Sequence, residues 1–143
     1  MRVLVVHGPN LNLLGEREPE IYGTVTLAEI DAAIAACAKE LGIEVVCEQH
    51  NAEGAIIDAL HAARKTCGGV VINPGAYAHY SYAIADAIAA IGIPVVEVHL
   101  SNVAAREPFR RTSVTAAACR AVVGGLGPTG YVLALRSMGE LAR

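Results

Sequence analysis

Short apolar runs alternate with helical patterns of apolar residues along the whole chain. Runs rich in β-branched residues predict five strands, at 2–6, 43–47, 69–72, 93–98 and 118–123. Between and after them, apolar residues recur at helical spacing and predict helices at 27–41, 53–66, 80–91 and 129–141. Near-continuous apolar strands that alternate with helices are typical of an α/β protein, in which a parallel sheet is covered by helices on both faces.

The local signals agree with this pattern. Thr26 and Glu29 stand in capping-box register at the start of the helix predicted over 27–41, and Gly42 ends it. For five βα units of this length we expect a flavodoxin-like, doubly wound, five-stranded parallel sheet of order 2-1-3-4-5. Such sheets bind ligands at the carboxyl ends of their strands, where strands one and three diverge, so the residues that follow the strands are the candidates for function.

Composition narrows the class of protein. The 143 residues predict one domain over residues 1–143, and a composition of 54% hydrophobic and 17% charged residues excludes a disordered chain. The low charge also favours burial of surface against other subunits. A net charge of −3 argues against nucleic acid as a partner. No apolar run reaches about 18 residues, and the first ends at His7-Gly8-Pro9-Asn10, so we expect a cytoplasmic protein without membrane contact.

Several familiar site types are missing from the sequence. The four cysteines have no C-x-x-C spacing and lie in apolar stretches, so we expect buried, reduced thiols at Cys37, Cys47, Cys67 and Cys119. His50 and His61 have no partners at metal-ligand spacing. We therefore expect both side chains to face solvent, and we expect no metal site. The only lysines, Lys39 and Lys65, fall on helix ends or exposed faces far from the strand ends, which excludes a Schiff-base nucleophile.

Two glycine-containing phosphate motifs are also excluded. Residues 125–130 match G-x-G-x-x-G literally, but too few residues follow Gly130 for the rest of a dinucleotide-binding unit. We interpret this stretch as a turn that allows close helix packing. The chain has no G-x-x-x-x-G-K-[ST] sequence, so a P-loop is absent.

Polar residues follow three of the predicted strands. The connection over residues 7–25 is much longer than a usual βα loop and carries apolar residues, which favours a lid; it contains Arg17 and Tyr22. A phenol acts as a base only where its anion is stabilised, which a nearby arginine can do. A packed tyrosine and a surface arginine are an equally good interpretation of these two residues alone.

The other two strand ends offer amide, imidazole and hydroxyl groups. Asn73 to His79 follow strand three, and Glu97, His99 and Ser101 lie at the end of strand four. The segment from Asn73 to His79 can also be interpreted as a tight turn and the start of a helix, with no role in function. His99 is placed where a proton-transferring histidine is needed, and its position on one rim with the other polar loops favours function over a solitary core histidine.

These motifs together resemble the type II 3-dehydroquinate dehydratases. The resemblance rests on Gly8-Pro9-Asn10-Leu11-Asn12-Leu13-Leu14-Gly15 with Arg17-Glu18-Pro19 and Tyr22-Gly23, on Asn73-Pro74-Gly75-Ala76, on Glu97-Val98-His99-Leu100-Ser101-Asn102, and on Phe109-Arg110 before Ser113. It covers essentially the whole chain. It implies a flavodoxin-like fold and a dehydratase of 3-dehydroquinate, in the shikimate pathway or quinate breakdown, that uses no cofactor or metal.

The resemblance also implies roles for individual residues. Tyr22 matches the proton acceptor, His99 the proton donor, Arg17 the residue that stabilises the base and the transition state, and Asn10 the residue that positions a water near the enolate. Glu97 matches a support for the histidine. The matching substrate-binding positions are Asn73, His79, Leu100, Ser101, Arg110 and Asp86.

The family assembles as trimers grouped into dodecamers, with the residue that matches Asp86 reaching a neighbouring subunit. Helical geometry places Asp86 away from the sheet, among Ala83, Ala87 and Ala90 on an outer surface of small side chains. We therefore expect a homo-dodecamer. Arg111-Thr112 stand where paired histidines are common in the family, which affects the expected subunit contacts only.

Two other functions use the same sheet. An FMN-binding module of flavodoxin type is the main alternative, although no Ser/Thr-rich phosphate loop follows strand one. A response-regulator receiver needs acidic residues after strand one and an aspartate after strand three, where this chain has His7 and Asn73, so we exclude it.

Overall fold

A computed structural model describes residues 1–142 of the chain. Within them, five parallel strands form one sheet in the order β2-β1-β3-β4-β5, which confirms the predicted flavodoxin-like arrangement. The strands are β1 (Arg2–His7), β2 (Glu44–Gln49), β3 (Gly69–Asn73), β4 (Val95–His99) and β5 (Ala121–Gly124). The helices are α1 (Pro19–Tyr22), α2 (Leu27–Leu41), α3 (Glu53–Thr66), α4 (Tyr82–Ile91) and α5 (Thr129–Leu141).

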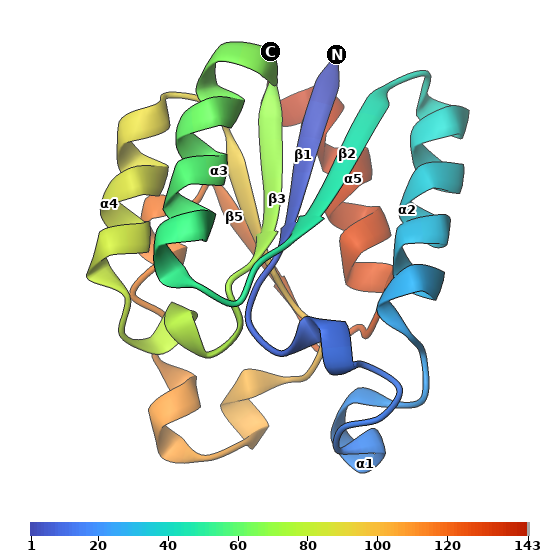
Figure 1. The fold of residues 1–143 in the computed structure, drawn as a ribbon, viewed down its shortest axis with the longest axis vertical. Helices are drawn as coiled ribbons and strands as arrows, with labels where there is room; N and C mark the ends of the chain where they lie inside the picture. The colour runs from blue at the N-terminus through green and yellow to red at the C-terminus, as the bar shows by residue number, and fades with distance from the viewer. Residues whose placement is uncertain (143) are drawn as a thin grey trace.

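The helices form a layer on each face of the sheet (Figure 1). Helices α3 and α4 cover one face and bury Leu4, Val6 and Ile72, which alternate along the strands with the residues of the other face. Helices α2 and α5 cover the opposite face, where Val3 and Val5 are buried. Because the strands are parallel, all of them end at the same side of the molecule, where α1 and the loop after β4 lie (Figure 1).

Several element boundaries differ from the sequence prediction, and three elements begin two or three residues later than predicted. Strand β4 begins at Val95 rather than at residue 93, since Pro94 has no N–H to donate to a ladder. Strand β5 begins at Ala121 rather than at residue 118, because Ala116–Ala118 form a 3-10 turn. Helix α4 begins at Tyr82, where the Ser81 hydroxyl caps it by accepting a hydrogen bond from the backbone N–H of Ile84.

The segment Pro19–Leu41 is long and apolar enough, by length and composition alone, to cross a membrane. In the structure it comprises two helices, α1 and α2, separated by residues 23–26. One side of α2 is buried against the sheet through Ile30, Ile34 and Cys37, while most of its other residues are exposed. Helix α2 is thus accounted for as an amphipathic core helix.

The isolated cysteines and histidines follow the expectations only in part. All four cysteines are free, but only Cys37 is buried and the other three are half-buried, so the prediction of burial is wrong for Cys47, Cys67 and Cys119. His61 is exposed as expected. His50 is half-buried instead, because its Nε2 pairs with Glu48 Oε2 at 2.8 Å.

The glycine-rich stretch before α5 serves packing, as predicted. A Cβ added to Gly130 would lie 3.4 Å from side-chain carbons of both Val98 and Val123. This close approach brings the first turn of α5 onto strands β4 and β5, which explains the glycine without a nucleotide.

Candidate active site

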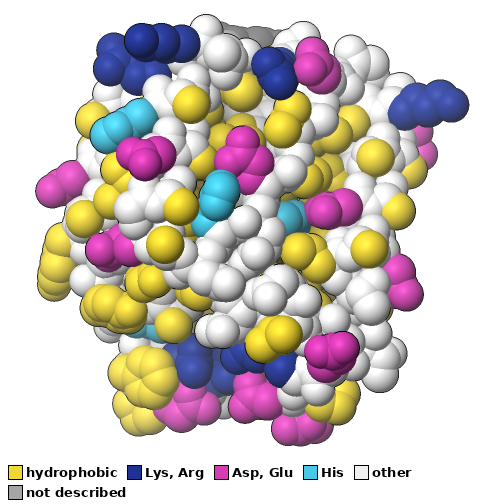
Figure 2. Space-filling view, in the orientation of Figure 1, with side chains coloured by type: hydrophobic (Ala, Val, Ile, Leu, Met, Phe, Trp, Pro, Cys, Tyr) yellow, Lys and Arg dark blue, Asp and Glu magenta, His cyan; other side chains and the backbone are white. Residues whose placement is uncertain are grey.

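A cavity of about 140 Å³ opens at the carboxyl ends of the strands. It brings together residues from the loops after β1, β3 and β4, as the sheet order predicts. Figure 2 shows basic side chains beside acidic ones at this end of the molecule. The lining of the cavity contains nine of the eleven predicted site residues. They are Asn10, Arg17, Tyr22, Asn73, His79, His99, Leu100, Ser101 and Arg110.

Tyr22, at the end of α1, has two guanidinium groups beside it. The Cζ atom of Arg17 is 4.7 Å from the centre of the Tyr22 ring, and that of Arg106 is 5.2 Å from it. Nη1 of Arg106 also donates a hydrogen bond of 2.7 Å to the Tyr22 hydroxyl. The structure thus brings two positive charges and a hydrogen-bond donor to this phenol.

Arg106 is a residue that the sequence prediction missed. It follows the 3-10 turn Val103–Ala105 after β4, in a loop whose arginines carry no spacing signal. Its Nη1 lies 3.5 Å from the Ser101 hydroxyl, so it joins the lid to the end of β4. Its Nε is buried and has no hydrogen-bond partner within residues 1–142, which leaves a donor for an anionic group of a ligand.

His99 is oriented by Glu97, two residues earlier in β4. Glu97 is fully buried, and its Oε2 accepts hydrogen bonds from His99 Nε2 at 2.9 Å and from the Ser113 hydroxyl at 2.8 Å. The Thr115 hydroxyl donates to its other oxygen. Burial by itself raises the pKa of Glu97, but the hydrogen bonds from His99, Thr115 and Ser113 and the proximity of His99 outweigh it and hold the pKa below its ordinary value.

An ionised Glu97 fixes the tautomer of His99. With Nε2–H donating to the carboxylate, Nδ1 is the ring nitrogen left for the cavity that His99 lines. His79 stacks beside it, with ring centroids 6.3 Å apart. His79 in turn donates from Nδ1 to the backbone carbonyl of Thr112 at 2.8 Å, so its Nε2 is the nitrogen left for a ligand.

The two predicted asparagines are held by backbone contacts. Asn73 ends β3 and is buried, and its Oδ1 accepts a hydrogen bond of 3.1 Å from the backbone N–H of Gly75. Its amide NH₂ is the donor side of the group and is in hydrogen-bonding contact with Tyr131. Asn10 adopts a left-handed conformation with φ of 67°, and its backbone N–H donates to Asn51 Oδ1 at 3.0 Å. This strained turn presents Asn10 at the mouth of the cavity.

The loop after β4 supplies the remaining candidates. Leu100 is buried and Ser101 half-buried at the end of the strand. Arg110 lies in the 3-10 turn Pro108–Arg111, stacks over Phe109 at 4.7 Å and pairs with Glu107. The structure therefore places one more guanidinium at the rim, with an acidic partner that an incoming anion must displace.

Asp86 is the predicted substrate-binding residue that does not line this cavity. Asp86 is exposed on α4, as helical geometry predicted. Ala87 beside it is buried, so the prediction that Ala87 belongs to the outer surface is wrong. Ala87 is covered because α4 packs along α3 as well as against the sheet.

Comparisons with known proteins bear directly on this site. The family model described as dehydroquinase class II matches residues 1–139. This chain belongs to the class II dehydroquinase family. It is 55% identical over 142 residues to a 3-dehydroquinate dehydratase of Pelotomaculum thermopropionicum, with 99% of both chains covered. It is also 55% identical to one of Desulforudis audaxviator, covering 99% of this chain and 94% of the relative.

Solved structures of the class II dehydroquinase family have the same fold. The type II dehydroquinase of Butyrivibrio crossotus superimposes with a TM-score of 0.96 at 48% identity, with 97% of each chain covered. That of Propionibacterium acnes gives a TM-score of 0.94 at 44% identity, covering 97% of this chain and 96% of its own. The FMN-binding alternative gains no support from the family or these relatives.

Proposed function

We propose that this chain dehydrates 3-dehydroquinate to 3-dehydroshikimate, as a lyase of the shikimate pathway. The observation that carries the proposal is the pairing of the Tyr22 hydroxyl with Arg106, in one cavity with a histidine held by a buried carboxylate. Family membership supports the same reaction. The cavity thus contains a base and an acid for one elimination.

The loss of water β to a ketone needs three things. A base must take the proton from the carbon beside the carbonyl, positive charge or hydrogen bonds must stabilise the resulting enolate, and an acid must protonate the leaving hydroxyl. In the proposed trans elimination Tyr22 is the base, and Arg17 and Arg106 stabilise its anion. Asn10 positions a water at the enolate oxygen. His99, protonated on both ring nitrogens beside the ionised Glu97, passes its Nδ1 proton to the leaving hydroxyl, which departs as water and leaves the imidazole in its Nε2–H form.

Substrate binding is assigned to the polar groups around this centre. The substrate carboxylate suits the backbone N–H groups of Leu100 and Ser101 and the guanidinium of Arg110. The amide of Asn73 and the free nitrogen of His79 suit the ring hydroxyls. These side chains supply every proton transfer of the reaction, so the proposed mechanism needs no cofactor.

We further propose that subunits complete one another's sites in a homo-dodecamer built from trimers. Asp86 and Tyr82 are one helical turn apart on α4 and share a face, and Tyr82 is 71% exposed. Aromatic side chains are enriched at subunit interfaces relative to the rest of the surface. In this arrangement Asp86 contacts substrate in the neighbouring subunit. The cytoplasmic location stays a prediction from the sequence.

Absorbance of the product tests the proposed reaction. Addition of 3-dehydroquinate to the purified protein should produce the ultraviolet absorbance of a conjugated enone. Borohydride present with substrate should leave the enzyme active, because Lys39 and Lys65 are exposed and neither lines the cavity. A protein that forms no enone, or one that is covalently reduced onto a lysine, would contradict the proposal.

A further inference from the structure

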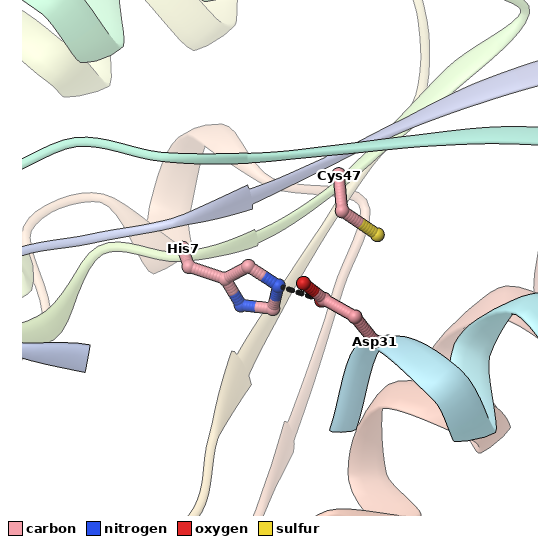
Figure 3. Close-up of side chains that lie close together, drawn as sticks. All are labelled: His7, Asp31 and Cys47. Atoms are coloured by element: carbon pink, nitrogen blue, oxygen red, sulfur yellow. Dashed lines mark hydrogen bonds and ion pairs between the residues drawn. The ribbon is translucent and has the colours of Figure 1, made fainter. Parts of the chain in front are cut away.

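Three side chains able to bind a metal converge outside the catalytic cavity. His7 ends β1, Asp31 lies on α2 and Cys47 lies on β2, and all three point into the space between the sheet and α2 (Figure 3). One nitrogen of His7, one oxygen of Asp31 and the sulfur of Cys47 all lie within 4.8 Å of one another. Their spacing along the chain resembles no metal motif, so the sequence alone did not reveal them.

The imidazole of His7 is fixed from its far side. It is 1% exposed, and its Nδ1 lies 3.0 Å from the hydroxyl of Tyr131, which is itself buried on α5. Its Nε2 lies 2.7 Å from Asp31 Oδ1. Histidine ligands of metals characteristically have their second ring nitrogen held by a hydrogen-bonding partner, which sets the tautomer and aims the ligating nitrogen.

We propose that His7, Asp31 and Cys47 bind a divalent zinc-type cation with one coordination position open to water. An imidazole, a carboxylate and a thiolate are ligands that zinc accepts, at bond lengths of about 2.0–2.3 Å. Tetrahedral ligands at such lengths lie about 3.3–3.6 Å apart. The His7–Asp31 pair, at 2.7 Å, must open slightly, which rotation of the partly exposed Asp31 side chain allows.

Protonation of the three groups defines what binding releases. Burial holds the pKa of His7 below its ordinary value, so its imidazole is neutral and ready to ligate. Burial, and then Asp31, raise the pKa of the Cys47 thiol to about 12. A cation therefore displaces the thiol proton to solvent. The proton on Nε2 of His7 moves to Nδ1, which then donates to the hydroxyl oxygen of Tyr131.

The site is separate from the reaction but adjoins the residues that perform it. None of the three ligands lines the catalytic cavity. His7 directly precedes the turn of Gly8, Pro9 and Asn10, and Tyr131 is in hydrogen-bonding contact with Asn73. A bound cation would join β1, β2 and α2 just below the cavity floor. Its effect is then on stability and on the position of these residues.

Metal titration of the full-length protein tests the site. After treatment with a chelator, Zn²⁺ should bind at one per chain, release one proton and raise Tm, because the ion binds the folded chain. Co²⁺ should give a sulfur-to-cobalt charge-transfer band, which reports a thiolate ligand. Cys47→Ser should abolish that band, and Asp31→Asn should weaken Zn²⁺ binding.

Matched variants separate this site from the other thiols. Cys67→Ser and Cys119→Ser change half-buried cysteines outside the cluster and should leave the stoichiometry and the band unchanged. Tyr131→Phe removes only the partner of Nδ1 and should weaken binding by about 10–100-fold. The proposal is overturned if the wild-type protein binds no Zn²⁺ at one per chain, or if Cys47→Ser and Asp31→Asn bind it as well as the wild type.

Discussion

Arg106 donates a hydrogen bond of 2.7 Å to the hydroxyl of Tyr22, a residue 84 positions earlier in the chain. The contact joins the loop after β1 to the loop after β4, so the proposed base is held by two segments that each look ordinary in the sequence. It also places a second positive charge at the phenol, beside that of Arg17. Removal of either charge therefore has a defined kinetic consequence.

Arg106→Ala should lower kcat by about 10²–10³-fold, the usual cost of removing one donor that stabilises a developing anion. Arg106→Lys keeps the charge and should recover part of that loss. Arg64→Ala removes an exposed arginine of α3 outside the cavity and should retain wild-type turnover. Steady-state assays with 3-dehydroquinate measure kcat for these variants. An Arg106→Ala enzyme with normal kcat would show that Arg106 has no part in the mechanism.

Glu97→Gln should reduce both stability and turnover. The buried carboxylate accepts hydrogen bonds from His99, Ser113 and Thr115. The NH₂ group of a glutamine at this position would face one of these donors and could not accept its hydrogen bond. We expect a loss of about 1–3 kcal/mol in the free energy of unfolding, measured in urea. We also expect kcat to fall while KM changes little, because His99 loses its orientation. A stable variant with wild-type kcat would show that His99 needs no support from Glu97.

Acid should destabilise the fold through His7. Burial places the pKa of folded His7 below its ordinary value of 6.5, so below that pH the unfolded chain binds a proton that the folded chain does not. Stability is therefore complete above 6.5 and falls as the pH drops toward the folded pKa, by up to about 1.4 kcal/mol per pH unit. Urea unfolding with a chelator present, at about pH 7.5 and about pH 5, should show a smaller loss for His7→Gln than for the wild type. Equal losses would contradict this account.

Asp86→Ala should raise KM about tenfold or more with a modest change in kcat, as expected for one lost hydrogen bond to a charged group worth about 1.5–3 kcal/mol. Asp58→Ala, which removes an exposed acid on α3, is the matched control and should behave like the wild type. Light scattering should give a mass near twelve chains for all three proteins. A fully active monomer would refute the shared site.

The sequence predicted the sheet and most of the cavity because both depend on local patterns. Strand ends are visible as the places where apolar runs stop, and parallel topology brings those ends to one edge. Arg106 and the cluster of His7, Asp31 and Cys47 were missed, because their contacts depend on the packing of segments far apart in the chain. Tyr131 reaches His7 across 124 residues, a relation that no spacing rule contains.

The boundary errors have a related cause. Residues 93–98 form an apolar run, but the backbone of Pro94 cannot complete a ladder, so the strand starts later than its hydrophobicity suggests. The half-buried state of these cysteines follows from their places in the fold rather than from their apolar neighbours: Cys47 is on the edge strand β2, Cys67 at the end of α3 and Cys119 directly after a 3-10 turn. Hydropathy indicates what can be buried, while the arrangement of elements decides what is buried.

The turnover of Tyr22→Phe with 3-dehydroquinate tests the central assignment most directly. The substitution keeps the ring beside Arg17 and Arg106 and removes only the hydroxyl that is the proposed proton acceptor. The variant should fold and bind substrate like the wild type while kcat, followed by enone absorbance, falls by about 10²–10⁴-fold. A folded Tyr22→Phe protein that forms the enone at a near wild-type rate would show that another group is the base.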